Sequence, residues 1–129
     1  MREWYFCDTE ALIARPDLLI SNPNPIVVSS ISVAELTAWK YSGQVVLDLI
    51  RELYKPQTPF RIIYPYNPDM FTELTKVKEL QESNEHRILA AAYHYDKTQH
   101  PDATVFITGS PELAETANLF FGEDSIILV

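Results

Sequence analysis

Residues 3–10 read EWYFCDTE, and the interpretation of the whole chain starts from this stretch. Residues 3–7 are mostly apolar and aromatic, which predicts a short buried strand. The strand runs directly into Asp8, and residues 9–14 have the composition of a short helix that ends before Pro16. Ligands of parallel α/β sheets bind beyond the carboxyl ends of the strands. Asp8 is therefore the first candidate for a functional side chain.

Apolar strands and helical segments alternate along the rest of the sequence. Apolar or β-branched runs predict four further strands, at residues 26–29, 60–64, 104–107 and 125–129. Helical spacing and cap residues predict helices at roughly residues 32–41, 44–55, 68–82, 85–97 and 111–118. This alternation predicts a single α/β domain over residues 1–129, with a mostly parallel sheet of about five strands and helices on both faces.

Three local signals set the expected boundaries. Ser32 and Glu35 have the spacing of a capping box, which places a helix start at Ser32. Gly43 is expected to separate that helix from the next one. The proline- and asparagine-rich residues 17–25 predict a loop.

The composition limits the classes of function. The 129 residues include 10 Lys and Arg against 18 Asp and Glu, a net charge of −8. Such a chain is a poor general polyanion binder, because phosphate contacts need clustered basic side chains. A single cysteine excludes an intramolecular disulfide framework. The sequence shows no signal peptide and no apolar membrane span, so a cytoplasmic protein without a membrane partner is expected.

Carboxylates follow several of the predicted strands. Asp8 follows the first strand, Glu35 lies on the helix after the second, and Glu85 begins the helix at residues 85–97. Because these positions share one edge of a parallel sheet, we expect the three carboxylates to lie close together. Oxygen ligands of this kind suit hard divalent cations such as Mg²⁺.

Four segments in this order resemble the PIN domain family. They are YFCDTEALI at residues 5–13, VAELTAWK at 33–40, NEHRILAAA at 84–92 and FITGSPEL at 106–113. PIN domains are metal-dependent ribonucleases, found among bacterial toxin nucleases and RNA-decay nucleases. The resemblance implies that Asp8, Glu35 and Glu85 hold one or two Mg²⁺ or Mn²⁺ ions, and that Ser110 orients a water on the metal.

The match departs from the family pattern at three positions. Glu10 stands where Asn is usual, Glu85 stands where Asp is usual, and Ser110 stands where the family often has Asp or Asn. The last change replaces a charged metal ligand by a neutral hydroxyl. Further residues near these motifs are expected to contact substrate or to support the site: Thr9, Asn84, Arg87, Thr108 and Glu112.

Each site residue also has a purely structural explanation. Asp8 suits a cap at a strand end, Glu35 suits the capping box, and Glu85 suits the positive end of a helix dipole. Ser110 before a proline is a favoured N-cap. Arg87 has no partner three or four residues away in its helix, which leaves it for a phosphate or for an ion pair elsewhere.

Aromatic residues beside Glu35 allow two interpretations. Trp39 and Tyr41 suit stacking with bases of single-stranded RNA. Alternatively, Trp39 packs against the core or against a second subunit.

Two functions from different classes are compatible with these residues. The first is an endoribonuclease that hydrolyses single-stranded or structured RNA with a metal-activated water. By resemblance it would be a homodimer, and the toxin role would add an antitoxin protein as partner. The alternative is a catalytically degenerate PIN-like domain that acts as a protein-interaction or RNA-binding module. Ser110, Glu85 and the acidic net charge favour this alternative.

Overall fold

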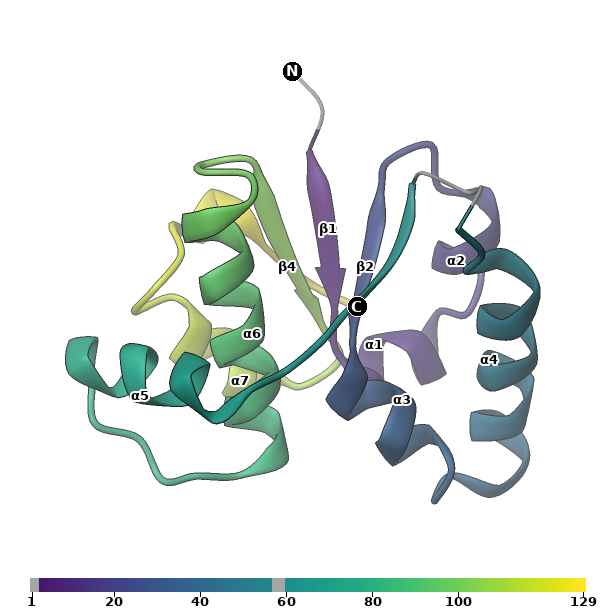
Figure 1. Ribbon diagram of the computed structural model, residues 1–129, viewed down its shortest axis with the longest axis horizontal. Helices are drawn as coiled ribbons and strands as arrows, with labels where there is room; N and C mark the ends of the chain where they lie inside the picture. Colours follow the sequence, from purple (N-terminus) through teal and green to yellow (C-terminus); the bar gives the residue numbers. More distant parts are fainter. Residues whose placement is uncertain (1–2, 57–59) are drawn as a thin grey trace.

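The fold is built on a parallel sheet of five strands, shown in a computed structural model that describes residues 3–56 and 60–129 (Figure 1). The strand order is β3-β2-β1-β4-β5, and every neighbouring pair is parallel. The strands are β1 (Trp4–Cys7), β2 (Ile26–Ser29), β3 (Arg61–Tyr64), β4 (Thr104–Thr108) and β5 (Ile126–Leu128). The predicted α/β domain with its parallel sheet is confirmed, strand for strand.

Two helical layers cover the two faces of the sheet (Figure 1). One layer contains α1 (Thr9–Ala14), α2 (Leu18–Ser21), α3 (Ser30–Leu36) and α4 (Lys40–Leu53). The other contains α5 (Pro68–Val77), α6 (Asn84–Thr98) and α7 (Pro111–Ala117), and a 3₁₀ turn η1 (Glu123–Ser125) precedes β5.

Alternation along the strands explains why two layers are needed. Phe6 and Phe106 are fully buried in the core beneath α5, α6 and α7. Their neighbours Cys7 and Ile107 are buried in the second core, beneath α1 to α4. Since side chains alternate between faces and both faces are apolar, the strands are stable only when covered on both sides.

The chain order creates a switch point in the centre of the sheet. The chain begins with β1 and moves outward to β2 and β3, then returns to β4 beside β1 and continues to β5. Helices that follow β1 and β4 therefore diverge to opposite faces. Such switch points leave a crevice beyond the carboxyl ends of the two central strands, and this is where ligands of α/β sheets bind.

The predicted start of α3 at Ser32 is wrong. The helix begins at Ser30, and the Ser29 hydroxyl caps it by accepting from the Ile31 N–H at 3.1 Å. Ser32 lies inside the helix and is fully buried. The capping box of Ser32 and Glu35 does not form, because both side chains are bonded to Thr9 instead.

Other boundaries differ from expectation by smaller amounts. Gly43 lies within α4 and does not separate two helices, since α4 already begins at Lys40. The expected helix at residues 68–82 ends at Val77. A short helix, α2, lies within residues 17–25, where only a loop was expected.

Within residues 3–56 and 60–129, none of the helices combines the length and the apolar character needed to cross a membrane.

Candidate functional site

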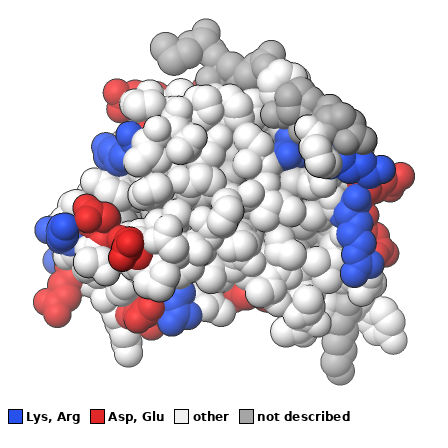
Figure 2. All heavy atoms as spheres, viewed as in Figure 1, with Lys and Arg blue, Asp and Glu red and all other residues white. Residues whose placement is uncertain are grey.

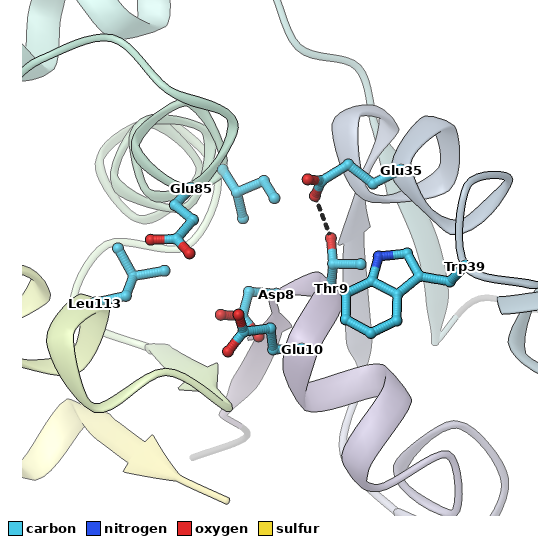
Figure 3. A pocket seen from close by; sticks show the side chains of 8 residues that line it. Asp8, Thr9, Glu10, Glu35, Trp39, Glu85 and Leu113 are labelled. Carbon is cyan, nitrogen blue, oxygen red and sulfur yellow. Dashed lines mark hydrogen bonds between the residues drawn. The ribbon is translucent and has the colours of Figure 1, made fainter. Parts of the chain in front are cut away.

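Four carboxylates surround a small hollow beyond the ends of β1 and β4 (Figure 3). They belong to Asp8 after β1, Glu10 on α1, Glu35 on α3 and Glu85 on α6. The hollow has a volume of about 50 Å³, and its other lining residues are Thr9, Trp39, Ile88 and Leu113. The structure thus brings Asp8, Glu35 and Glu85 to one site, as the sequence predicted, although they are far apart in the chain.

Asp8 is the most buried of these acids, with only 3% of its surface exposed. It caps α1, and its Oδ1 accepts from the Ala11 N–H at 2.7 Å and the Gly109 N–H at 3.3 Å. Its Oδ2 accepts from the hydroxyl of Thr108, which itself accepts from the Ser110 N–H at 3.0 Å. Asp8 therefore ties the end of β1 to the end of β4 through Thr108, and the supporting role of Thr108 in a functional site stays a prediction.

Burial raises the pKa of Asp8 to about 6, well above its ordinary value of 3.8. The hydrogen bonds from Thr108, Ala11 and Gly109 oppose this change, while the charge of Glu10 adds to it. Loss of hydration therefore outweighs the donors that hold the charged form. A cation beside Asp8 would favour ionisation and bring its pKa down.

Glu35 is held in place from two sides. Its Oε1 accepts from the Thr9 hydroxyl at 2.6 Å, and its Oε2 lies 3.4 Å from the Asn84 Nδ2. The Thr9 oxygen is also 3.0 Å from the Ser32 hydroxyl oxygen. A hydroxyl carries one hydrogen, so when Thr9 donates to Glu35 the hydrogen of this second bond comes from Ser32. Thr9 thus positions Glu35, and Ser32 is a supporting residue that the sequence argument missed.

Arg87 extends this network away from the hollow. Its Nη1 donates to the Asn84 Oδ1 at 2.8 Å, and its Nε donates to the Glu82 Oε1 at 3.1 Å. The two residues of this ion pair are five positions apart in the sequence. Glu82 lies just before α6 and not within it. The ion pair agrees with the alternative that Arg87 pairs with a carboxylate elsewhere, whereas the expectation of no partner three residues away is wrong, because Asn84 is that partner. The guanidinium supports Asn84, and through it Glu35.

Glu85 faces Asp8 and Glu10 across the hollow (Figure 3). Partial burial raises the pKa of Glu85, and the negative charges of Glu10, Glu112 and Glu35 add to the effect. Glu10 is the acid that the sequence argument placed beside Asp8 but did not assign to the site. The position of Glu10, two residues after Asp8 in the first turn of α1, is the feature of the sequence that indicates its place at the hollow. Glu112 does not line the hollow, although its charge reaches Glu85.

Ser110 is engaged as a helix cap. Its Oγ accepts from the Leu113 N–H at 3.2 Å, which makes it the N-cap of α7. Ser110 is not among the residues that line the hollow. The structural explanation of this serine accounts for its contacts, and its expected role in orienting a water stays a prediction.

The donor chemistry of the hollow suits a hydrated divalent cation. The donors are hard carboxylate oxygens, and about 50 Å³ is room for an ion with some of its water. No three His, Cys, Asp or Glu side chains of residues 3–56 and 60–129 are positioned together as a ready-made ligand set. Mg²⁺ usually keeps several waters and takes one or two protein carboxylates, so the residues fit such an ion with Asp8 as the central ligand.

Comparison with models of known protein families gives no match, and comparison with curated proteins gives none either. The structure therefore places the chain in the class of α/β folds with a five-stranded parallel sheet.

Proposed function

We propose that this protein is a PIN-like, metal-dependent endoribonuclease. One observation carries the proposal: a buried carboxylate, Asp8, lies at the switch point of a parallel sheet, and Glu10, Glu35 and Glu85 surround the same hollow. Carboxylates gathered from α1 and its N-cap, from α3 and from α6 are the ligand type that hard divalent cations use in phosphodiester hydrolysis. The order of the four sequence motifs supports the same assignment.

In the proposed nuclease, Asp8, Glu10, Glu85 and Thr9 would have different roles in holding the metal ion. Bound Mg²⁺ or Mn²⁺ would supply positive charge to the phosphate and a more acidic water. Asp8 would hold the ion, because it is the one buried carboxylate that lines the hollow and three hydrogen bonds orient it. Glu85 and Glu10, which line the same hollow, would add negative charge and oxygen acceptors for the ion and its water. Thr9 would hold Glu35 at the hollow through its hydrogen bond of 2.6 Å.

A non-catalytic module remains the second candidate, and two observations favour it. Ser110 stands where the family often has an acid, and its hydroxyl is used as a helix cap. In addition, no three metal-binding side chains of the described residues form an assembled ligand set. Such a domain would keep the fold and bind RNA or a protein without turnover.

Cleavage assays separate the two candidates. A mixed panel of single-stranded and structured RNA is incubated with Mg²⁺, Mn²⁺ or EDTA, using wild type, Asp8→Asn and Glu79→Gln. Glu79 is exposed in the loop after α5, so its variant removes one negative charge away from the hollow. If the protein is the proposed nuclease, RNA cleavage should require the metal, persist in Glu79→Gln and disappear in Asp8→Asn. Equal cutting by wild type and Asp8→Asn would reject Asp8 as the catalytic ligand.

A homodimer and an antitoxin partner belong to the same proposal, as implied by the PIN resemblance. Light scattering across a concentration series tests the dimer. A small reading frame beside the gene, whose product blocks RNA cleavage when added to the protein, tests the antitoxin.

A further inference from the structure

Trp39 forms a wall shared by two cavities. It lines the acidic hollow together with Glu35, and it also lines a more open groove of about 340 Å³ with Asn84 and the small residues Ala34 and Ala38. In Figure 3 the indole lies beside Thr9, across the hollow from Glu85. The flat face of an aromatic ring thus borders both the carboxylates and the space next to them.

Trp39 is not a core residue. Its side chain is 42% exposed, and it belongs to neither of the two hydrophobic clusters of the described residues. The alternative that Trp39 packs against the core is therefore wrong, and the alternative that it packs against a second subunit stays a prediction. A large apolar side chain that stays exposed beside a polar hollow is available to a ligand.

Gly43 shows how the chain keeps Trp39 at this place. A Cβ atom at position 43 would lie 2.1 Å from the Leu36 carbonyl oxygen and 2.7 Å from the Trp39 Cβ. Glycine inside a helix lowers stability relative to alanine, so its presence within α4 needs a reason. Here it lets the first turn of α4 lie against the end of α3, and this close approach sets the position of Trp39 between them.

The charges around Trp39 indicate which part of an RNA its ring would contact. The hollow is lined by four carboxylates, and the nearby Arg87 is paired with Glu82 and Asn84. On the face seen in Figure 2, basic and acidic side chains are interspersed along the margins and form no broad basic patch among the described residues. Phosphate contacts alone would therefore give little affinity, and a neutral base offers the better contact.

We infer that Trp39 is a stacking platform for an unpaired nucleobase, which places the adjoining phosphate at the carboxylates. The inference rests on the proposed function for its substrate class, and it adds a residue that positions the substrate. Bases of single-stranded nucleic acids stack on aromatic side chains, and this contact tolerates any base because each has a π-face. Asn84 borders the same groove, but its amide already contacts Glu35 and Arg87, so the ring makes the main contact with the base.

The two tryptophans of the chain allow a direct test. Trp4 starts β1 at the opposite end of the sheet, where its ring stacks on His100 at 3.7 Å. The Trp4→Phe variant therefore reports on Trp39 alone, and the Trp39→Leu variant reports on Trp4 alone. The probes are an unstructured RNA of mixed sequence and an abasic sugar–phosphate oligomer of the same length. Both are titrated in Mg²⁺ and in EDTA, and gels confirm that the RNA stays intact.

The platform predicts that RNA quenches the emission of Trp4→Phe and leaves that of Trp39→Leu unchanged. The abasic oligomer should quench neither variant. In anisotropy titrations, Trp39→Leu should bind RNA about 5- to 150-fold more weakly, the range expected for loss of one stacked base. Trp39→Phe should recover most of the binding. Circular dichroism of each variant confirms that it is folded.

The results for Trp39 and for catalysis can be told apart. Quenching without cleavage would support the platform while rejecting the nuclease. Metal-dependent cleavage with no quenching, and with unchanged affinity in Trp39→Leu, would overturn the platform and leave the nuclease standing. Equal quenching by the abasic oligomer would also overturn it, because the contact would then be with the sugar–phosphate backbone. No binding of either probe would overturn it as well.

Discussion

Asp8→Asn should make the protein more stable at neutral pH while removing cation binding. Asp8 is 3% exposed, and burial raises its pKa from 3.8 to about 6 in the folded protein. Between these two values the folded state binds more protons than the unfolded state, so stability falls as pH rises through this window. Above about pH 6 the ionised Asp8 lowers the free energy of unfolding by its full amount. The difference between the two pKa values corresponds to roughly 3 kcal/mol.

The variant should recover part of this free energy. Asparagine is neutral and its amide oxygen still accepts from the Ala11 and Gly109 N–H groups. Its amide nitrogen cannot accept from the Thr108 hydroxyl, and the disturbed bond costs about 1 kcal/mol. We therefore expect a net gain of roughly 1–2 kcal/mol at pH 7.5 without divalent cations, which shrinks toward pH 4.

Urea denaturation followed by circular dichroism measures this at pH 4.5, 6 and 7.5 in EDTA, with Glu79→Gln as the control. Divalent cations should reverse the order, because only wild type would gain binding free energy. At a Mg²⁺ concentration one hundred times the dissociation constant, this gain is about 2.7 kcal/mol, which exceeds the advantage expected for the variant. The reasoning is refuted if Asp8→Asn is less stable than wild type at pH 7.5 by an amount that does not change at pH 4.5.

Three other substitutions test neighbouring parts of the site. Thr9→Val should lower stability by about 1–2 kcal/mol and weaken Mg²⁺ binding, because Glu35 loses its 2.6 Å donor; calorimetric titration with Mg²⁺ measures the second effect. Gly43→Ala should destabilise by about 1–3 kcal/mol through its contact with α3, although alanine normally strengthens a helix; a stabilised variant in thermal unfolding would contradict the geometry. Thr108→Val should raise the pKa of Asp8 above about 6, because a hydrogen-bond donor to the charged form is lost. The decrease of the free energy of unfolding with rising pH should then extend to higher pH, which urea denaturation at several pH values measures.

The strands could be predicted from the sequence because their signal is local. Residues 26–29 and 104–108 are buried along their whole length, and short apolar runs of this kind suit only the interior of a covered sheet. Parallel pairing then brings every carboxyl end to one edge. Asp8, Glu35 and Glu85 could be grouped for that reason alone, without any knowledge of side-chain contacts.

The details that sequence missed depend on partners far along the chain. Ser32 and Glu35 have capping-box spacing, but Thr9, more than twenty residues earlier, bonds to both side chains. Gly43 is typical of a helix break, yet it lies within α4, and the glycine is needed there because the end of α3 leaves no room for a Cβ atom. In both cases a tertiary contact overrides a local preference, and no window of neighbouring residues contains the information.

The pKa shifts of the acids favour the proposed functional cluster over a set of independent helix caps. A cap or a first-turn acid works well at the surface, where water keeps its charged form stable. Here burial raises the pKa of Asp8, and burial together with neighbouring carboxylates raises that of Glu85, so the fold opposes the charges it has gathered. Hydrogen bonds from Thr108 and Thr9 nevertheless hold Asp8 and Glu35 at the hollow. Perturbed pKa values of this kind are enriched at functional sites, and a cation bound in the hollow would reduce the repulsion between the acids.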